Sequence, residues 1–504
     1  MTVARKESIS VSLLFFLLSA AIFGRVIFFD FVNLDDPSNL KKNPAMQDIA
    51  LAWNKPYLDA YLPITYTAWW ALSGLSQADH RDSHEIETWT PIPELDPAVF
   101  HLANLVLHAC GTVLLYLSLR TLFPDASRSL LLLLSGIFLL HPLQVEAIAW
   151  VTALKDVLSG CLSLLLIYLF VQKPLSDYRG RRNTQRMLLL ASIFLAACLA
   201  KSTRVFLPLW LLWLGHLQWK KPGVQLFVDL LPLFVIACVI VILAMIIQPH
   251  PKDMVYQEIW RRPLIAADAL GFYIFKLFWP INLALDYGRN PRFLFESGQG
   301  YWTWIFVALI VIPCWYLRKR LHPWLLLGMA GFVISLLPLL GLTPFVFQTI
   351  STVSDRYCYL ALALLIIGVT PVLSKIPQQK NLLVFLSVIV LLLGARSYCQ
   401  LPAWRNSMTL WEHTFSVTPD SAIAHNNLAS IYEELGNAPL AIEHYEKSML
   451  RLPRAETCSR IAILYTDVGN WEKAYVWVKR GLALNPTDTI LRQNEAAIAA
   501  QLQK

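Results

Sequence analysis

Residues 9–29, ISVSLLFFLLSAAIFGRVIFF, form an apolar run that is followed by the stretch Phe31-Val32-Asn33-Leu34-Asp35-Asp36. About 20 predominantly apolar residues in a helix are enough to cross the hydrocarbon core of a bilayer. The adjacent carboxylates therefore lie where the chain is expected to leave the membrane. Arg5 and Lys6 precede the run, as in a signal peptide, but the run is long for that purpose and a retained first span is expected.

The composition excludes an ordinary soluble domain, because 56% of the 504 residues are hydrophobic and only 15% are charged. Apolar runs near 20 residues recur almost without pause to about Gly394, after which the chain from Trp404 to Lys504 becomes polar. Such runs predict a polytopic, all-α membrane unit. The eleven predicted spans cover residues 9–29, 98–119, 129–147, 157–172, 187–200, 203–219, 225–247, 302–317, 323–340, 357–373 and 381–396.

The distribution of Lys and Arg decides which side each loop occupies, because cytoplasmic loops carry an excess of both. With eleven spans, the basic residues fall mainly in inner loops. A twelfth span at Ala266–Leu285 would place Arg318-Lys319-Arg320 outside, so this segment is expected to lie at the outer interface. The loops 30–97 and 248–301, the turns near 141–156 and 341–356, and the polar C-terminal part then share the outer face.

The net charge of +8 does not indicate nucleic-acid binding, because the basic residues lie in short loops and form no stripe interleaved with aromatic residues. The eight cysteines include no Cys-x-x-Cys motif. Most fall within or beside apolar runs, where buried thiols behave as small hydrophobic groups.

The polar C-terminal part carries a tetratricopeptide pattern, which predicts an α-solenoid of stacked helix pairs. A half unit from Ser407 to Pro419 precedes the repeats, and the tail after Pro486 is expected to form a capping helix. Such an array could bind an acceptor polypeptide or only scaffold an oligomer. Two units match the consensus positions 33 residues apart, through Leu428, Ala429, Tyr432, Gly436, Ala441, Tyr445 and Pro453, and through Ile461, Ala462, Tyr465, Gly469, Ala474, Gly481 and Pro486.

Asp35 and Asp36 are the first candidates for chemistry. Carboxylates at the end of a span are costly unless they face water or a partner. Adjacent residues in an extended segment point in different directions, so one should face the reaction centre while the other orients the loop. Pro37 favours an extended conformation at Asp36, and we slightly favour Asp36 as the base. The structural alternative is a solvated exit from the helix.

A second set of candidates lies in the turn near 141–156 and comprises His141, Glu146, Lys155 and Asp156. A Glu within apolar sequence needs a partner, which His141, Lys155 or Lys201 could provide. The spacing of His141 and Glu146 does not place them on one helical stripe, so this segment alone predicts no metal site. A divalent metal held by Asp36 with Glu146 or Asp156 remains an open alternative.

Three cations, Lys201, Arg204 and Arg356, occupy outer turns where the charge rule favours none. An arginine presents a rigid fork that suits phosphate oxygens. An internal salt bridge, such as Arg356 with Asp355 or Glu146, is the alternative. Asp286 and Tyr287, which follow the interfacial segment, complete the candidate set.

These motifs together resemble the transmembrane-and-tetratricopeptide protein O-mannosyltransferases, and more closely the bacterial tetratricopeptide membrane proteins related to them. The resemblance covers nearly the whole chain and rests on the order of several motifs. They are Asp35-Asp36, the segment Phe100 to His108, the segment His141 to Asp156, the segment Ala266 to Tyr273, the segment Ser351 to Tyr357, and Trp404 before the repeats.

The resemblance implies a GT-C glycosyltransferase fold, polyprenyl-phosphate sugar donors and Ser or Thr hydroxyl acceptors, with the catalytic acid residue in Asp35-Asp36. The composition and the distribution of Lys and Arg predict two domains, a transmembrane domain at residues 1–397 with outer loops 30–97 and 248–301, and a repeat domain at residues 398–504 on the outer side. With the resemblance to bacterial proteins, the expected location is a bacterial inner membrane with the repeat domain in the periplasm. No cofactor is required with certainty. The alternatives are a non-enzymatic scaffold that recruits envelope proteins and a transporter of lipid-linked sugars.

Overall fold

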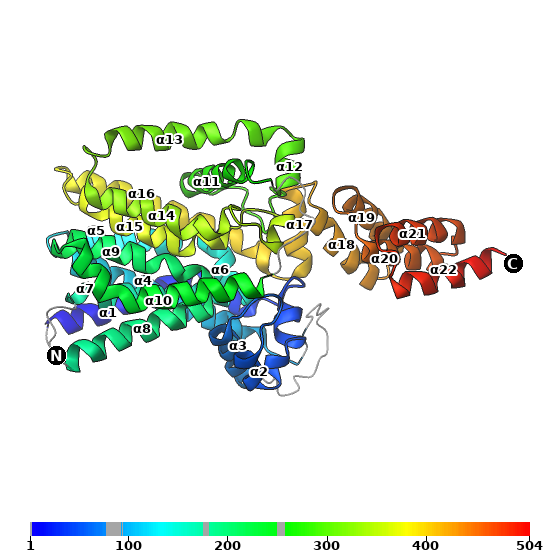
Figure 1. The fold of residues 1–504 in the computed structure, drawn as a ribbon, viewed down its shortest axis with the longest axis horizontal. Helices are drawn as coiled ribbons and strands as arrows, with labels where there is room; N and C mark the ends of the chain where they lie inside the picture. Colours follow the sequence, from blue (N-terminus) through cyan, green and yellow to red (C-terminus); the bar gives the residue numbers. More distant parts are fainter. Residues whose placement is uncertain (1–2, 77–91, 93, 175–180, 249–257, 504) are drawn as a thin grey trace. The chain divides into compact units, whose positions relative to one another are not determined.

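The chain folds into helices in the computed structural model, which describes residues 3–76, 92, 94–174, 181–248 and 258–503 (Figure 1). No strand occurs in these residues. They form two compact units. The first comprises Met1–Leu283 and Asn290–Asn406, and the second comprises Ala284–Arg289 and Ser407–Lys504. The predicted all-α class is confirmed.

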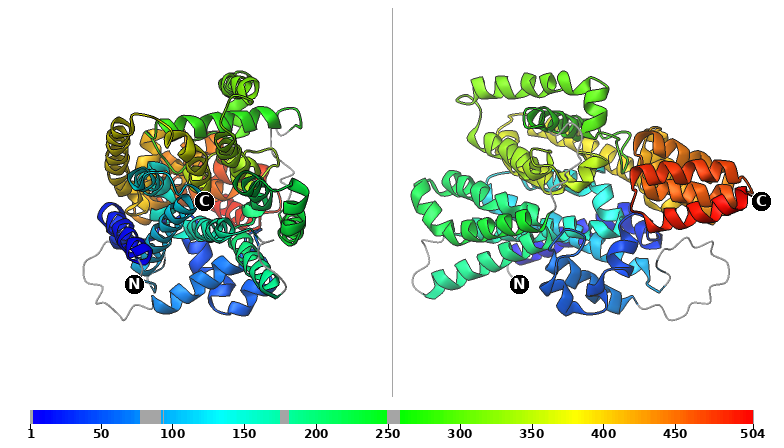
Figure 2. Two further views of the ribbon diagram at one scale, coloured as in Figure 1. Left: turned by 90° about the vertical axis from the view of Figure 1, so that its left-hand side faces the viewer. Right: turned by 45° about the vertical axis from the view of Figure 1, so that its right-hand side comes forward.

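The first unit, here called the membrane unit, has long helices that run in roughly the same direction (Figures 1 and 2). Its α-helices are α1 (Val3–Phe23), α2 (Ile49–Asn54), α3 (Pro63–Leu75), α4 (Pro97–Leu122), α5 (Arg128–Leu140), α6 (Val145–Ala149), α7 (Leu154–Gln172), α8 (Arg181–Ala200), α9 (Leu207–Trp219), α10 (Gly223–Ile247), α11 (Arg262–Phe278), α12 (Pro291–Glu296), α13 (Trp304–Leu317), α14 (Pro323–Leu336), α15 (Cys358–Leu373) and α16 (Gln379–Gln400).

Eight helical segments in the described residues are long and apolar enough to cross a membrane, which makes the chain an integral membrane protein. A ninth span results if α5 and the segment Pro142–Ala149, bent by 47°, count as one. The other two of the eleven predicted spans are α9 and α14, which have only 13 and 14 residues. At 1.5 Å per residue, such helices fall short of a hydrocarbon core about 30 Å thick. The described residues thus contain eight or nine segments that meet the length and composition requirement, and the number of eleven stays a prediction.

Helix starts in the membrane unit follow local sequence signals. The carboxylate of Asp96 accepts the N–H of Ala98 at 3.0 Å, and Pro97 occupies the first turn of α4. Both features favour a helix start. Farther along, α14 and α15 approach closely where Gly328 faces Gly368, since a Cβ on Gly328 would lie 2.7 Å from the Cα of Gly368. Glycine at this crossing lets the two backbones pack directly.

The loop after the first span folds back onto α4 and brings the Asp35-Asp36 segment into a packed environment. A buried cluster joins Phe31, Tyr66 and Trp69 to Phe100 of α4. The hydroxyl of Thr65 donates to the carbonyl of Ala200 at 2.8 Å, which ties α3 to the end of α8. The predicted loop 30–97 is thus largely ordered helix in its described part.

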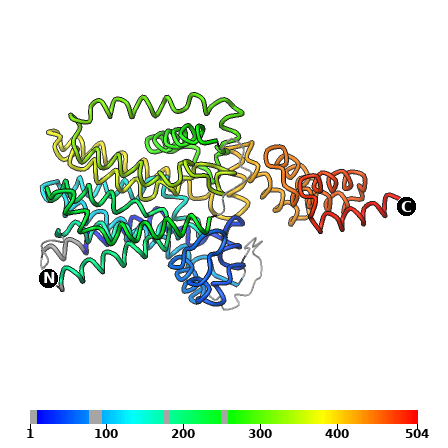
Figure 3. Tube along the Cα trace, viewed as in Figure 1, coloured from blue at the N-terminus to red at the C-terminus, as the bar shows by residue number. Residues whose placement is uncertain are grey.

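The second unit, here called the repeat unit, contains α17 (Ser407–Val417), α18 (Ala422–Glu434), α19 (Ala438–Arg451), α20 (Ala455–Asp467), α21 (Trp471–Leu484) and α22 (Thr489–Leu502) (Figure 3). The turns of the pairs α18–α19 and α20–α21 both need a left-handed glycine, Gly436 at φ +73° and Gly469 at φ +76°. Asn437 and Asn470 then cap the second helices. The same local solution therefore occurs twice, 33 residues apart.

Small residues at repeated positions allow the helices of the repeat unit to pack closely. Ala429, Ala441, Ala462 and Ala474 are all fully buried in one core with Tyr445. The tail after Pro486 is helical, as α22. The tetratricopeptide assignment itself stays a prediction. Residues 398–406, which the sequence predicts to belong to the repeat domain, fall in the membrane unit.

Candidate active site

Four segments that are far apart in the sequence meet where helices of the membrane unit end. They are the loop after η1 (Gly24–Phe28), the turn from η4 (Pro142–Gln144) to η5 (Val151–Ala153), η7 (Ser202–Phe206) and η11 (Asp355–Tyr357). Side-chain contacts of Asp36 with Thr152, Glu146 with Arg356, and Asp156 with Lys201 join them. Each segment follows or precedes an apolar helix, which is why the charged residues gather there.

Asp36 is fully buried and both of its carboxylate oxygens are occupied. One oxygen accepts the N–H of Val32 at 2.9 Å, and the other accepts the N–H of Thr152 at 3.2 Å together with the Thr152 hydroxyl. Burial raises the pKa of Asp36 to about 6, although these hydrogen bonds oppose the shift. Asp36 therefore joins the first loop to η5, and its oxygens are already committed within the protein.

Asp35 is half-buried, and its carboxylate makes no hydrogen bond within the described part of the chain. Only its backbone carbonyl is used, which accepts the N–H and the side-chain amide of Asn39, each at 2.9 Å. The carboxylate interacts electrostatically with Asp36 and with Tyr357 of η11. Of the two adjacent carboxylates, Asp35 is thus the one open to a substrate, whereas the sequence slightly favours Asp36 as the base.

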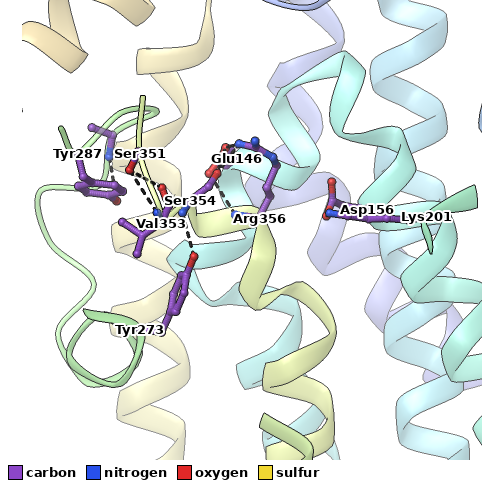
Figure 4. Close-up of polar contacts among 10 residues, drawn as sticks. Glu146, Asp156, Lys201, Tyr273, Tyr287, Ser351, Val353, Ser354 and Arg356 are labelled. Atoms are coloured by element: carbon purple, nitrogen blue, oxygen red, sulfur yellow. Dashed lines mark hydrogen bonds and ion pairs between the residues drawn. The ribbon is translucent and has the colours of Figure 1, made fainter. Parts of the chain in front are cut away.

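Glu146 of α6 and Arg356 of η11 form a buried ion pair (Figure 4). Glu146 also accepts the Ser354 hydroxyl at 2.8 Å and the backbone N–H of Arg356 at 3.1 Å. The phenol oxygen of Tyr273 accepts the backbone N–H of Ser354 at 3.0 Å, which braces this turn from α11. The pairing of Arg356 with Glu146, one of the alternatives the sequence left open, is present.

Aromatic rings hold the guanidinium of Arg356 in place. It lies 4.9 Å from the ring centre of Trp150 and 5.0 Å from that of Phe347. Trp150 in turn stacks on Trp404, with ring centres 6.2 Å apart and planes at 24°. The next residue, Arg405, accepts the N–H of Asp30 through its carbonyl at 2.9 Å. One short segment therefore contacts both the Arg356 side and the Asp35 side of the site.

Asp156 and Lys201 form a second buried ion pair (Figure 4). Burial lowers the pKa of Lys201 to about 8, although Asp156 opposes the shift. The second carboxylate oxygen of Asp156 is buried without a partner among the described residues. Arg204 also lies within electrostatic reach of Asp156, and its Nε donates to the Ser159 hydroxyl at 3.1 Å. Lys201, Arg204 and Arg356 thus surround two carboxylates, Asp156 and Glu146.

His141 and Lys155, the other two candidates in the turn near 141–156, take part in neither ion pair. His141 caps the following turn, because its Nδ1 accepts the N–H of Leu143 at 3.2 Å, and its Nε2 lies 3.0 Å from the carbonyl of Leu277. Both ring nitrogens are therefore used by the backbone, and His141 is not available for proton transfer. Lys155 lies with its ammonium 5.7 Å from the ring centre of Trp150.

Asp286 and Tyr287 belong to the repeat unit. The carboxylate of Asp286 accepts the Ser421 hydroxyl at 2.6 Å and the N–H of Gly288 at 2.7 Å, and burial raises its pKa to about 6. The hydroxyl of Tyr287 accepts the N–H of Ala284 at 3.1 Å. These contacts attach the segment Ala284–Arg289 to the start of α18, so Asp286 has a structural role within its unit.

The residues do not fit a metal ion. No group of three or more His, Cys, Asp or Glu side chains that could hold one occurs in the part of the chain that the structure describes. Asp36, Glu146 and Asp156, the metal ligands considered from the sequence, each have separate partners in Thr152, Arg356 and Lys201.

Thr152 is a site residue that carries no sequence signal of its own, and the ring contact between Trp150 and Trp404 is likewise not visible in the sequence. A threonine or tryptophan near a membrane surface is ordinary, and its partner is fixed only by folding. Thr152 lies within the segment His141 to Asp156. The only sequence feature that pointed to it was the need of the Asp35-Asp36 carboxylates for hydrogen-bond donors.

Comparison with known proteins gives distant matches to one group. No protein-family model matches the chain. Protein O-mannosyl-transferase TMTC1 of Homo sapiens is 24% identical over 446 residues, covering 74% of this chain and 48% of the human protein. A protein O-mannosyl-transferase of Caenorhabditis elegans is 22% identical over 446 residues, covering 82% of this chain and 59% of the relative.

A shorter match is more similar. Protein O-mannosyl-transferase Tmtc1 of Drosophila melanogaster is 33% identical over 111 residues, which cover 22% of this chain and 12% of the relative. The chain spans about half the length of the curated relatives that it matches over most of its sequence. The chain is therefore a polytopic membrane protein with distant similarity, along most of its length, to animal proteins named protein O-mannosyl-transferases.

Proposed function

We propose that the chain is a GT-C-type membrane glycosyltransferase that moves a sugar from a polyprenyl-phosphate donor to a Ser or Thr hydroxyl of a protein. The observation that carries the proposal is the gathering of three buried cations, Lys201, Arg204 and Arg356, around Asp156 and Glu146. Tyr357 lies within electrostatic reach of both Arg356 and the unoccupied carboxylate of Asp35. Buried charges are costly to maintain even when they are paired, as Arg356 and Lys201 are. The distant similarity to O-mannosyl-transferases supports the same chemistry.

In the proposed reaction, Asp35 accepts the proton of the acceptor hydroxyl as its oxygen attacks the anomeric carbon. The bond between that carbon and the phosphate oxygen breaks, and the phosphate leaves with the electron pair. Arg204 and Arg356 stabilise the charge that develops on the phosphate, an electrostatic effect that is strong in a site excluded from water. Asp36 acts as a positioning residue, because it fixes the loop that carries Asp35.

The test is glycan mass spectrometry of membrane and exported proteins from cells with and without the chain. We expect a hexose on Ser or Thr residues that disappears with the gene and returns with the unaltered chain. A control complementation with Asp35→Asn should leave the hexose absent. An unchanged glycan profile in the absence of the chain would contradict a protein acceptor, and loss of envelope complexes without any glycan change would favour the scaffold.

The proposed site faces the side of the membrane opposite the N-terminus, in a bacterial envelope the periplasm. Inner loops predicted from Lys and Arg support this orientation. A reporter that is active only outside the cytoplasm should be active when it is fused after Lys504. The same reporter should be inactive when it is fused after Lys319. A cytosolic signal from the Lys504 fusion would overturn the orientation. In the proposed orientation the repeat unit lies on the outer side, where it could present acceptor polypeptides.

A further inference from the structure

One face of α4 carries three polar side chains within an otherwise apolar span. His101, Asn104 and His108 follow one another at positions i, i+3 and i+7, which is the spacing of a single helix face. All three are buried. Polar side chains inside a membrane need partners and mark functional positions. The proposed reaction assigns no role to these residues, here called the α4 polar stripe.

Asn104 ties α4 to the turn between α6 and η5. Its side-chain amide donates to the carbonyl of Trp150 at 2.9 Å and to the carbonyl of Ile148 at 3.4 Å. Both carbonyls lie where α6 ends, and the last carbonyls of a helix have no partner within that helix. A side chain of a neighbouring span therefore fixes the backbone at this point.

The same turn contacts both sides of the candidate site. The guanidinium of Arg356 lies 4.9 Å from the ring centre of Trp150. Two residues farther along, Thr152 donates its N–H and its hydroxyl to Asp36, which holds the loop that carries Asp35. The position of this turn therefore determines where the first loop is attached.

His108 joins the end of α5 to the start of α15. Its Nε2 lies 2.9 Å from the carbonyl of Leu139, and its Nδ1 lies 3.0 Å from the hydroxyl of Tyr359. A carbonyl can only accept, so Nε2 carries the proton, and in the neutral ring Nδ1 accepts the hydroxyl of Tyr359. Tyr359 is three residues from Arg356, so this bond holds the end of η11.

The ring of Tyr359 is seated between two glycines. It lies so close to Gly160 of α7 that a Cβ there would overlap it, and a Cβ on Gly111 of α4 would lie 3.4 Å from its hydroxyl oxygen. Next to Gly160, the hydroxyl of Ser159 accepts the Nε–H of Arg204 at 3.1 Å. The orientation of this ring thus sets how α15 packs on the part of α7 that contacts Arg204.

We propose that His101, Asn104 and His108 are positioning residues that hold three segments of the candidate site from one helix face. Asn104 and His108 do so through the hydrogen bonds described above. His101 packs edge-on against Phe29, with ring centres 6.4 Å apart and planes at 84°, and Phe29 begins the loop that carries Asp35. The inference rests on the proposed function for the reaction that the positioned residues perform.

The first experiment compares Asn104→Ala with Thr112→Val in the purified full chain by hydrogen exchange and mass spectrometry. Thr112 is the matched control, because it is buried on the same helix and its hydroxyl donates to the carbonyl of His108 at 3.0 Å, within α4. We expect Asn104→Ala to speed exchange in residues 29–36 and 148–156 by about tenfold or more, about 1.4 kcal/mol of local opening. Exchange in α14 should stay within about twofold, and Thr112→Val should change none of these regions.

The kinetic measurement separates positioning from general stability. Displacing a reacting group by about 1 Å can cost on the order of 10²-fold in rate. We therefore expect Asn104→Ala to lower kcat for sugar transfer by about 10–10²-fold. The KM for the lipid donor should stay within about threefold, because Arg356 keeps its ion pair with Glu146. The unfolding temperature should match that of Thr112→Val.

A second variant covers the case in which Asn104→Ala does not fold. Tyr359→Phe removes one hydroxyl and keeps the ring against Gly160. Loss of its hydrogen bond to His108 should speed exchange in residues 353–360 by about threefold or more, while residues 29–36 stay within about twofold.

The outcomes that would overturn the proposal are specific. They are equal acceleration throughout the membrane unit in Asn104→Ala, the same local changes in Thr112→Val, and unchanged exchange in residues 29–36 and 148–156. Unchanged exchange in residues 353–360 of Tyr359→Phe would remove His108 from the α4 polar stripe.

The α4 polar stripe and the proposed function can fail separately. Local opening in Asn104→Ala, in a chain that transfers no sugar, would remove the function and retain the positioning role. Sugar transfer with the same kcat in Asn104→Ala as in the unaltered chain would retain the function and overturn the positioning role.

Discussion

Replacing Asp35 with Asn is expected to reduce sugar transfer by about 10²–10⁴-fold, the usual contribution of a general base. The substitution removes the basic oxygen and preserves the size of the side chain. Because the Asp35 carboxylate makes no hydrogen bond within the described residues, the unfolding temperature should change little. The measurement is the initial rate of transfer from a lipid-linked sugar, together with thermal unfolding of the purified protein.

The matched control is Asp36→Asn, one residue along the chain. Its amide would oppose either the N–H of Val32 or the donors of Thr152, all of which now face a carboxylate oxygen. A buried donor left without an acceptor costs about 1–3 kcal/mol. Asp36→Asn should therefore lower the unfolding temperature, with activity lost as the loop shifts. The reverse pattern, an active Asp35→Asn and a stable but inactive Asp36→Asn, would assign the base to Asp36.

Replacing Arg356 with Ala is expected to destabilise the membrane unit by about 3–5 kcal/mol, since it leaves the buried carboxylate of Glu146 without its cation. Arg356→Lys keeps the charge but loses the planar fork that contacts Glu146 and Ser354 and that is proposed to bind the donor phosphate. It should retain most of the stability while the KM for the lipid donor rises. Thermal unfolding and donor titration separate the two effects.

The control for Arg356 is the double variant Glu146→Gln with Arg356→Met. Replacing both members of a buried ion pair is often neutral for stability, whereas removing one is not. We expect the double variant to recover stability relative to Arg356→Ala without recovering donor binding. Intact donor affinity in Arg356→Ala would limit the residue to a structural role, and unchanged stability as well would leave it with none.

Much of the fold follows from local sequence patterns. Long apolar runs predict the spans. Asp96-Pro97 marks the start of α4, and Gly436 and Gly469 mark the turns between paired helices of the repeat unit. The number of spans was harder to predict, because α9 and α14 are as apolar as their neighbours but have only 13 and 14 residues, and no local pattern fixes where a short helix lies relative to the membrane. Pro222 follows the end of α9, and Pro338 lies in the turn that follows α14.

The site was predictable as a set of charged segments but not as a set of partners. Asp35, Asp36, Glu146, Asp156 and the three cations stand out in an apolar sequence. Which carboxylate pairs with which cation depends on contacts across 45 to 210 residues, and no local pattern encodes them. The same limit explains why Thr152 was missed and why His141, whose nitrogens bind backbone groups, looked available.

The stacking of Trp404 on Trp150 and the hydrogen bond from Asp30 to Arg405 have a practical consequence for anyone who divides this protein. A truncation at the last predicted span, near residue 397, would delete a wall of the pocket that holds Arg356, and its inactivity would be misread as dependence on the repeats. A cut after Asn406 keeps that wall. Chimaeras that exchange repeat units between relatives should accordingly be joined at Ser407, so that they report on the role of the repeat unit rather than on damage to the candidate site.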